Sequence, residues 1–264
     1  MKLFRKIFNW IKSWFRGDFS IIQYDIIDST NEQAKRLIAT GAVRDSAVIV
    51  ADQQSAGRTT KFNHEWKSPT GNAYVSYVYK TDAKALKNLT EISTVTSAAI
   101  LKTIQYFAMS SDIKSINAKI KWPNDVLINE KKLSGVLIET EKVAGENFVI
   151  IGAGINVLNA PELSSGRMAT CLKDEGIYVQ PQRFARVYAR FLRKLLQKLT
   201  DGKFEGIRDF VLSQSYRIGE QITIITKDGH KISGRFAHVD KHGVMILETK
   251  TGEMERIVSG KIID

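Results

Sequence analysis

The stretch KWPNDVLINEKKLSGVLIET, residues Lys121 to Thr140, decides the fold prediction. Its second half, LSGVLIET, is rich in apolar and β-branched residues, and AKIKW lies at its start, so we expect a strand on each side of a turn at NEKK. Pro123 restricts Trp122 to an extended backbone, which ends the first strand at a defined place. The stretch therefore predicts a β-hairpin.

Such a hairpin would gather four polar or charged side chains, namely Lys121, Asn124, Asp125 and Lys132. One interpretation is a binding site for negatively charged groups. The other is an ordinary turn, with Asn and Asp in turn positions and lysines that face water. This stretch alone does not choose between them.

Outward from the hairpin, strands and helices alternate irregularly. We expect strands at residues 19–28, 46–52, 71–80 and 148–157, and helices at residues 29–41, 90–109 and 181–202. Ser29 and Glu32 have the spacing of a capping box, and Gly41 suits a helix end. The charged face of the last helix, with Arg183, Arg186, Arg190, Arg193 and Lys194, is typical of a solvated surface. Several adjacent strands in the middle of the chain predict the α+β class.

The sequence pattern changes near residue 219, from long helices and strands to short strands and turns. Short strands such as QITIIT and VMILET are separated by KDGH, DKHG and KTG, which are hairpin turn signals. We expect a larger domain over residues 18–216 and a small all-β module over residues 217–264.

Two further stretches are polar or glycine-bearing where a core would be apolar. QQSAGRTTKFNHEW, residues 53–66, follows a buried strand and could hold an anion with exposed amides and Arg58. IGAGIN, residues 151–156, places Gly152 and Gly154 in an aliphatic strand, which often means that something approaches the backbone closely. It lacks the third glycine of a dinucleotide fingerprint.

Together these stretches suit one chemical problem. Activating a carboxylic acid with a nucleotide phosphate requires two negative groups to touch. Fixed cations such as Arg58, Lys121 and Lys132 would remove the repulsion and stabilise charge in the transition state.

KWPNDVLINEKKLSGVLIE and IGAGINV resemble the signatures of biotin protein ligases. STN at residues 29–31, QxxGR at residues 54–58 and ATCLKDEG at residues 169–176 follow in the order expected for that family. The similarity runs from about Tyr24 to the C-terminus. It implies a mixed-sheet α+β catalytic domain of class II synthetase-like or biotin ligase type, plus a small C-terminal SH3-like β-barrel.

The resemblance also implies an activity and its partners. Biotin and MgATP would give biotinyl-5′-AMP and pyrophosphate. A lysine of a biotin carboxyl carrier protein or domain, of acetyl-CoA carboxylase or another biotin-dependent carboxylase, would then attack the mixed anhydride. We expect a cytoplasmic enzyme, either a monomer or a homodimer.

Site residues are carried over by position from the resemblance. The catalytic residues would be Lys132, Arg58 and Lys121. The biotin-binding residues would be Ser29, Thr30, Asn31, Gln54, Gly57, Arg58, Thr59, Thr60, Lys132 and Gly135. The ATP- or adenylate-binding residues would be Lys121, Trp122, Asn124, Asp125, Gly152, Gly154 and Asn156, with Asp125 as a magnesium ligand.

The sequence departs from the family pattern in two places. Only some twenty residues precede the catalytic domain, so we expect a short form without an N-terminal DNA-binding domain and no specific DNA partner. The family loop GRGRxGRxW is GRTTKFNHEW here, one residue longer and without the later arginines. Neither Thr60 nor Lys61 replaces a bidentate guanidinium, so we expect weaker retention of the adenylate.

Composition bounds these expectations. The 264 residues carry a net charge of +11, which favours anionic partners without choosing among them. A single cysteine, Cys171, excludes a disulfide framework and favours a reducing compartment. Residues 1–17 are basic with helical apolar spacing. We expect an amphipathic helix that either docks on the protein or a second copy, or makes a peripheral membrane contact.

Two other functions stay open at this stage. A lipoate ligase or octanoyl transferase would share the fold, and the transferase would need Cys171 as a nucleophile. A non-enzymatic nucleic-acid-binding protein would suit the charge, but no helix–turn–helix pattern is present.

Overall fold

The computed structural model describes residues 14–15, 19–59, 66–82, 85–162, 168–226 and 228–263. Its larger part is built on a sheet with the strand order β1-β2-β3-β4-β8-β7-β6-β5. The strands are β1 (Trp14–Phe15), β2 (Ser20–Ile27), β3 (Ala47–Gln54), β4 (Ala73–Thr81), β5 (Ala118–Lys121), β6 (Asp125–Ile128), β7 (Lys131–Val143) and β8 (Glu146–Ile155). Strands β2 and β3 are parallel and the other pairs are antiparallel, so the sheet is mixed. This confirms the α+β prediction.

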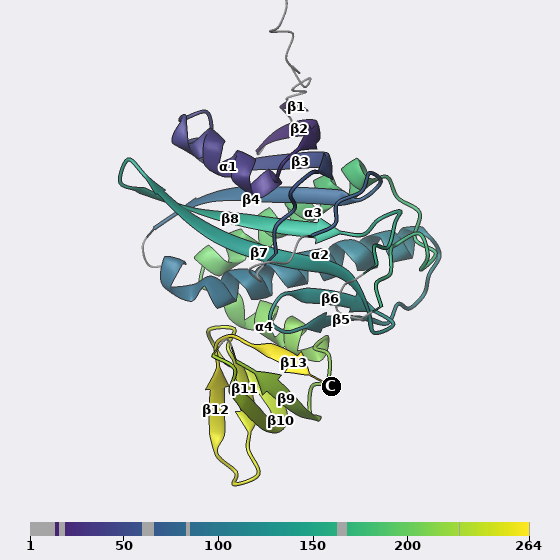
Figure 1. The fold of residues 1–264 in the computed structure, drawn as a ribbon. Coiled ribbons are helices and arrows are strands. Elements are labelled where there is room, and N and C mark those ends of the chain that lie inside the picture. The colour runs from purple at the N-terminus through teal and green to yellow at the C-terminus, as the bar shows by residue number, and fades with distance from the viewer. Residues whose placement is uncertain are drawn as a thin grey trace, which may run out of the picture.

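Helices cover both faces of the sheet (Figure 1). They are α1 (Thr30–Ala39), the 3-10 turn η1 (Ala85–Asn88), α2 (Leu89–Ser110), α3 (Pro181–Thr200) and α4 (Phe204–Ser213). Helices α2 and α3 pack on one face and α1 on the other. None of the described helices is both long and apolar enough to cross a membrane.

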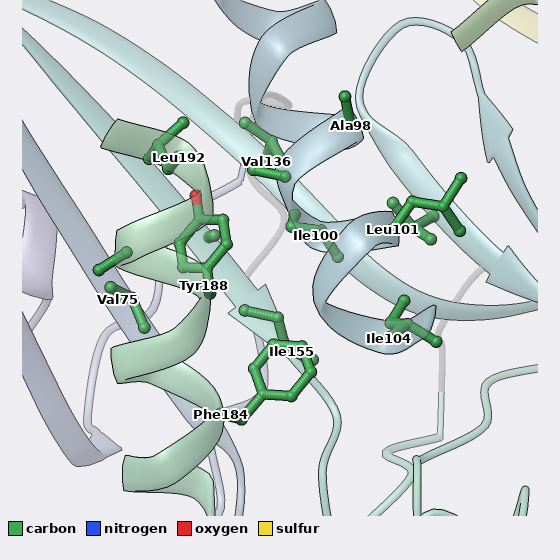
Figure 2. Packing of buried hydrophobic residues seen from close by; sticks show 14 of the residues in the cluster. Val75, Ala98, Ile100, Leu101, Ile104, Val136, Ile155, Phe184, Tyr188 and Leu192 are labelled. Atoms are coloured by element: carbon green, nitrogen blue, oxygen red, sulfur yellow. The ribbon is translucent and has the colours of Figure 1, made fainter. Parts of the chain in front are cut away.

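The main core lies between the sheet and α2 and α3. Figure 2 shows Tyr188 and Phe184 of α3 directed towards Val75 and Ile155 of the sheet, and these four side chains are fully buried. Burial of a large apolar side chain contributes about 1.5–3 kcal/mol. The core therefore holds the sheet rigid beneath anything bound on the opposite face.

The C-terminal β module is an antiparallel sheet with the order β12-β11-β10-β9-β13. Its strands are β9 (Gln221–Ile225), β10 (Lys231–Val239), β11 (Met245–Glu248), β12 (Met254–Ile257) and β13 (Lys261–Ile263). It lies beside β5 and α4 in Figure 1. The expected strands of this region are all present, and β13 was not foreseen.

Three local predictions need correction. The single β-hairpin is wrong, because AKIKW (β5) and LSGVLIET (β7) do not pair with each other and β6 lies between them. Ser29 makes no side-chain cap of α1, so the capping box is wrong, because Glu32 instead pairs with Lys35 and Arg58. Trp14–Phe15 form a short strand and not part of a helix. The rest of the expected helix at residues 1–17 lies outside the described residues. Gly41 follows α1 with a φ of 70°, which confirms its role at the helix end.

Candidate active site

The candidate site lies on the α1 face of the sheet, and the alternation of β8 explains why. Ile151, Ala153 and Ile155 point into the main core under α2 and α3. Their neighbours point to the other face, where Ile150 packs under α1. Gly152 and Gly154 continue that second row, so apolar side chains give way to bare backbone there.

Neighbouring strands extend the backbone surface at Gly152 and Gly154, which we call the floor of the site. Gly152 pairs with Ser76 of β4 and Leu137 of β7, while Gly154 pairs with Gly135 of β7. A Cβ atom on Gly152 would come within 2.5 Å of the Asn31 amide oxygen. Small residues are required because other side chains occupy the space above the strands.

Trp66 covers the second part of the floor. A Cβ atom on Gly154 would meet its indole ring at 2.5 Å, and one on Gly135 would meet it at 3.0 Å. The backbone N–H of Trp66 donates to Gly57 O at 2.9 Å, which closes the base of the loop at residues 53–66, here called the opening loop. Thr60 and the following loop residues to position 65 lie outside the described residues.

Polar residues meet at the α1 end of the floor. Gln54 Oε1 accepts a hydrogen bond from Thr30 N–H at 2.9 Å, and its Nε2 donates to Ser68 Oγ at 3.0 Å. Thr30, Asn31 and the neighbouring Ser29 are almost fully buried. The predicted STN and QxxGR stretches are thus brought together.

Arg58 is connected to the α1 end of the floor by ion pairs. Its guanidinium pairs with Glu32, and lies 2.9 Å from Glu139 Oε1. Lys35 Nζ contacts the same two carboxylates, at 3.0 Å and 2.8 Å. Two cations and two anions therefore balance locally, and they hold the opening loop at Arg58.

Lys132 and Asp125 form the opposite end. Lys132 Nζ lies 2.6 Å from Asp125 Oδ1 and 5.3 Å from the centroid of the Trp66 ring. Asn124 is beside them, because its Nδ2 donates to Val136 O at 2.8 Å. Three of the four side chains expected at the hairpin end therefore share one region.

The fourth, Lys121, is held differently. It is only 6% exposed, and its Nζ lies 5.2 Å from the centroid of the Tyr216 ring. Trp122, expected among the ATP- or adenylate-binding residues, packs in the core of the C-terminal β module with Ile222 and Phe236. The KWPND motif therefore contacts both the sheet of the larger domain and the C-terminal β module.

Asn156 and the ATCL stretch close the Lys132 end from behind. Asn156 Nδ2 donates to Thr170 O at 3.0 Å, whereas its buried Oδ1 has no hydrogen-bond partner among the described residues. Ala169 forms a β-bridge with Lys132. Cys171 is fully buried, and this burial raises the pKa of its thiol.

Sequence reasoning missed four residues of this site: Ser68, Ser76, Trp66 and Glu139. Trp66 was read only as the end of the loop. Glu139 carried a usable signal, because it is an acid within the strand GVLIET at the same alternation as Gly135. An acid on a half-buried face needs partners, and here it has three.

This fold and site define a known class. Residues 24–156 match the Biotin/lipoate A/B protein ligase family, and the chain belongs to that family. Residues 218–263 match the Biotin protein ligase C terminal domain, which narrows the class to ligases of the biotin protein ligase type.

Individual relatives lead to the same family. The chain is 31% identical to the Bifunctional ligase/repressor BirA of Bacillus subtilis over 92% of this chain and 73% of the relative. It is 30% identical to the Biotin--[acetyl-CoA-carboxylase] ligase of Paracoccus denitrificans, over 85% and 92% respectively. The biotin protein ligase from Aquifex aeolicus in complex with biotin and ATP is 25% identical and superimposes with a TM-score of 0.76, over 92% of this chain and 97% of that one.

Proposed function

We propose that this protein is an ATP-dependent biotin–protein ligase that forms biotinyl-5′-AMP and then transfers biotin to a lysine. The observation that carries the proposal is the floor itself. A strip of glycines, covered by Asn31 over Gly152 and by the Trp66 ring over Gly154, runs from a buried polar end at Thr30 and Asn31 to a charged end at Lys132 and Asp125. Biotin has the same polarity, with a polar ureido ring at one end and a carboxylate at the other.

In the first step, a carboxylate oxygen of biotin attacks the α-phosphorus of ATP. The bond from that phosphorus to the pyrophosphate oxygen breaks, and the mixed anhydride forms. Lys132 would hold the carboxylate and stabilise the growing negative charge. Lys121 would lower the electrostatic energy of the phosphates, and Arg58 would do so after leaving its ion pairs with Glu32 and Glu139.

In the second step, the amine of the acceptor lysine attacks the carbonyl carbon of the anhydride. The bond to the AMP oxygen breaks, an amide forms and the amine loses a proton. Lys132 would polarise the carbonyl oxygen again, so one residue would serve both steps. We propose a biotin carboxyl carrier domain as the acceptor, because the Paracoccus relative is named for acetyl-CoA carboxylase.

Magnesium would arrive with ATP. Among the described residues, no cluster of three or more His, Cys, Asp or Glu side chains is arranged to hold a metal ion. Mg²⁺ is commonly held by one or two carboxylates together with substrate phosphates, and Asp125 fits that requirement. When bound, the ion would neutralise phosphate charge, while Asp125 and Asn124 would orient it. A cytoplasmic location, a homodimer and membrane contact through residues 1–17 remain proposals.

The related octanoyl transfer reaction needs a nucleophilic thiolate, and Cys171 does not suit that role. It is fully buried, and the raised pKa of its thiol disfavours the thiolate. A lipoate ligase would need no thiol, so the ligand assay must separate it from a biotin ligase.

The experiment is to incubate the protein with ATP and either biotin or lipoate, and to measure pyrophosphate release and bound adenylate by mass spectrometry. We expect biotinyl-AMP only. Lys132→Ala should slow adenylate formation by about 10²–10³-fold, while the matched change Lys131→Ala one residue away should have little effect. Lipoyl-AMP in place of biotinyl-AMP, or wild-type rates in Lys132→Ala, would overturn the proposal.

A further inference from the structure

A chain of buried polar side chains runs beneath the α1 end of the floor. Asn31 Nδ2 donates to Glu139 Oε2 at 2.9 Å, and Ser76 Oγ lies within hydrogen-bond distance of Asn31 Oδ1. Ser76 Oγ is also 2.8 Å from Thr30 Oγ1. Four residues from α1, β4 and β7 are therefore linked in one line, none of it on a loop.

The line has a defined direction. A carboxylate accepts hydrogen bonds only, so the NH₂ group of Asn31 must face Glu139 and its oxygen must face Ser76. An amide oxygen also only accepts, so the single proton of Ser76 points to Asn31. Ser76 Oγ also has donor geometry towards Thr30 Oγ1 at 2.8 Å, but its one proton is committed to Asn31. Thr30 must then supply the proton of this contact, because otherwise two hydroxyl lone pairs would face each other.

This direction decides what Thr30 can offer to a ligand. Its proton is used towards Ser76, and Gln54 Oε1 at 3.2 Å is the longer alternative. Its oxygen keeps an unused lone pair. Thr30 is 4% exposed whereas Ser76 is 0% exposed, so the Thr30 end of the line is the one that reaches the site.

Glu139 is well suited to anchor the direction. Burial acts to raise the pKa of its carboxyl, but hydrogen bonds from Lys35 and Asn31 and the charges of Lys35 and Arg58 outweigh it and hold the pKa below its usual range. The carboxylate thus stays an acceptor near neutral pH. Protonation would let it donate, and the direction would no longer be fixed.

We propose that Glu139 is a positioning residue which, through Asn31 and Ser76, forces Thr30 to present a hydrogen-bond acceptor to an N–H donor of the ligand. The inference rests on the proposed function, and in biotin the donor is a ureido N–H. A ligand with an acceptor at that place would meet a lone pair and be rejected. Glu139 thereby contributes to selectivity without touching the ligand.

The experiment compares biotin with an analogue in which one ureido N–H is replaced by a ring oxygen. Both nitrogens are replaced in turn, and binding is measured by titration calorimetry. For one of the two analogues we expect wild-type protein to bind biotin at least about tenfold more tightly, the value of one hydrogen bond. In Glu139→Gln, whose amide can present either end to Asn31, this ratio should fall several-fold.

A second variant isolates the line of hydrogen bonds from the local charge balance. Ser76→Ala is a small change that removes the middle link, and it should lower the same ratio. Because both variants act through one line, Glu139→Gln with Ser76→Ala should lower it no further than Ser76→Ala alone, within about twofold. Glu141→Gln, two residues along the same strand, is the matched control and should keep the wild-type ratio.

The outcomes separate the ideas. An unchanged ratio in Glu139→Gln, or effects of the two changes that multiply, would mean that Glu139 only balances the charges of Lys35 and Arg58, and the inference would be overturned. Failure of wild-type protein to bind biotin at all would instead overturn the proposed function. The inference is supported if the ratio of biotin affinity to analogue affinity falls in Glu139→Gln and in Ser76→Ala while both variants still bind the analogue.

Discussion

The two ends of the site floor are held by different forces. At the α1 end, hydrogen bonds and ion pairs connect Thr30, Asn31, Ser76 and Glu139 within one domain. At the Lys132 end, the KWPND turn is fixed by apolar packing, because Trp122 is buried among side chains of the C-terminal β module. Directional bonds suit an end that must discriminate, whereas the packed end depends on a second module.

Trp122→Ala should give the largest effect and would break the packed end. Removal of a buried Trp side chain costs about 3–5 kcal/mol, so we expect that loss in the free energy of unfolding by denaturant titration. Adenylate formation should fall much more than equilibrium binding of biotin. Tyr178→Ala is the control, because Tyr178 is 74% exposed. Equal losses in binding and in adenylate formation would contradict the proposed division between the ends.

Gly152→Ala tests the directional end. Its new methyl group would lie 2.5 Å from Asn31 Oδ1, so Asn31 must move and the line to Ser76 must distort. Overpacking of this kind typically costs about 1–3 kcal/mol. We expect biotin affinity to fall while ATP affinity changes little, which is the reverse of Trp122→Ala.

The control for that substitution is Gly206→Ala in α4. A Cβ atom there meets nothing within 4 Å, so the change should be neutral or slightly stabilising. Unchanged biotin affinity in Gly152→Ala would show that Asn31 can shift without consequence.

The smallest expected effect is on the pH dependence of stability, at the turn where the C-terminal β module contacts α2. Burial acts to raise the pKa of Asp240, but the amides of His242 and Val244 and the Arg256 guanidinium hold the pKa below its usual range. His242 in turn contacts Glu91 of α2, with 2.8 Å between Nδ1 and Oε1. Asp240 therefore shapes a turn that joins the module to the catalytic domain.

A lowered folded pKa gives stability that is present above the unfolded value of about 3.9 and is lost as the pH falls through the folded pKa. Asp240→Asn should cost about 1 kcal/mol at pH 7 and lose less than wild type on acidification. Denaturant titrations between pH 7 and pH 3 measure both. Glu255→Gln, an exposed change on β12, is the control, and parallel pH curves for Asp240→Asn and wild type would exclude this role.

Much of the fold followed from periodicity. The long strands and the apolar stripes of α2 and α3 were predicted because each of them spans many residues of one pattern. Short elements were missed, among them β6, with four residues, and α4, whose ten residues carry little pattern of their own.

The site was harder to predict than the fold. Family motifs named Thr30, Gln54 and Lys132, which the structure places along one floor. They could not say that Arg58 pairs with two carboxylates, or that Trp122 faces another module, because both contacts join residues far apart in the chain. Glu139 was missed for the same reason, since its partners lie in α1 and in the opening loop.

The burial of Trp122 also sets an order of events during synthesis. Its cover includes Ile262, 140 residues further along the chain (262 minus 122). At about 5–20 residues per second, a ribosome needs roughly 7–28 s to cover that interval. During that time the strand carrying Lys132 can already have formed its hairpin, but the turn beside it lacks its apolar partner. A nascent chain thus acquires its finished reaction centre only after residue 262 has been translated.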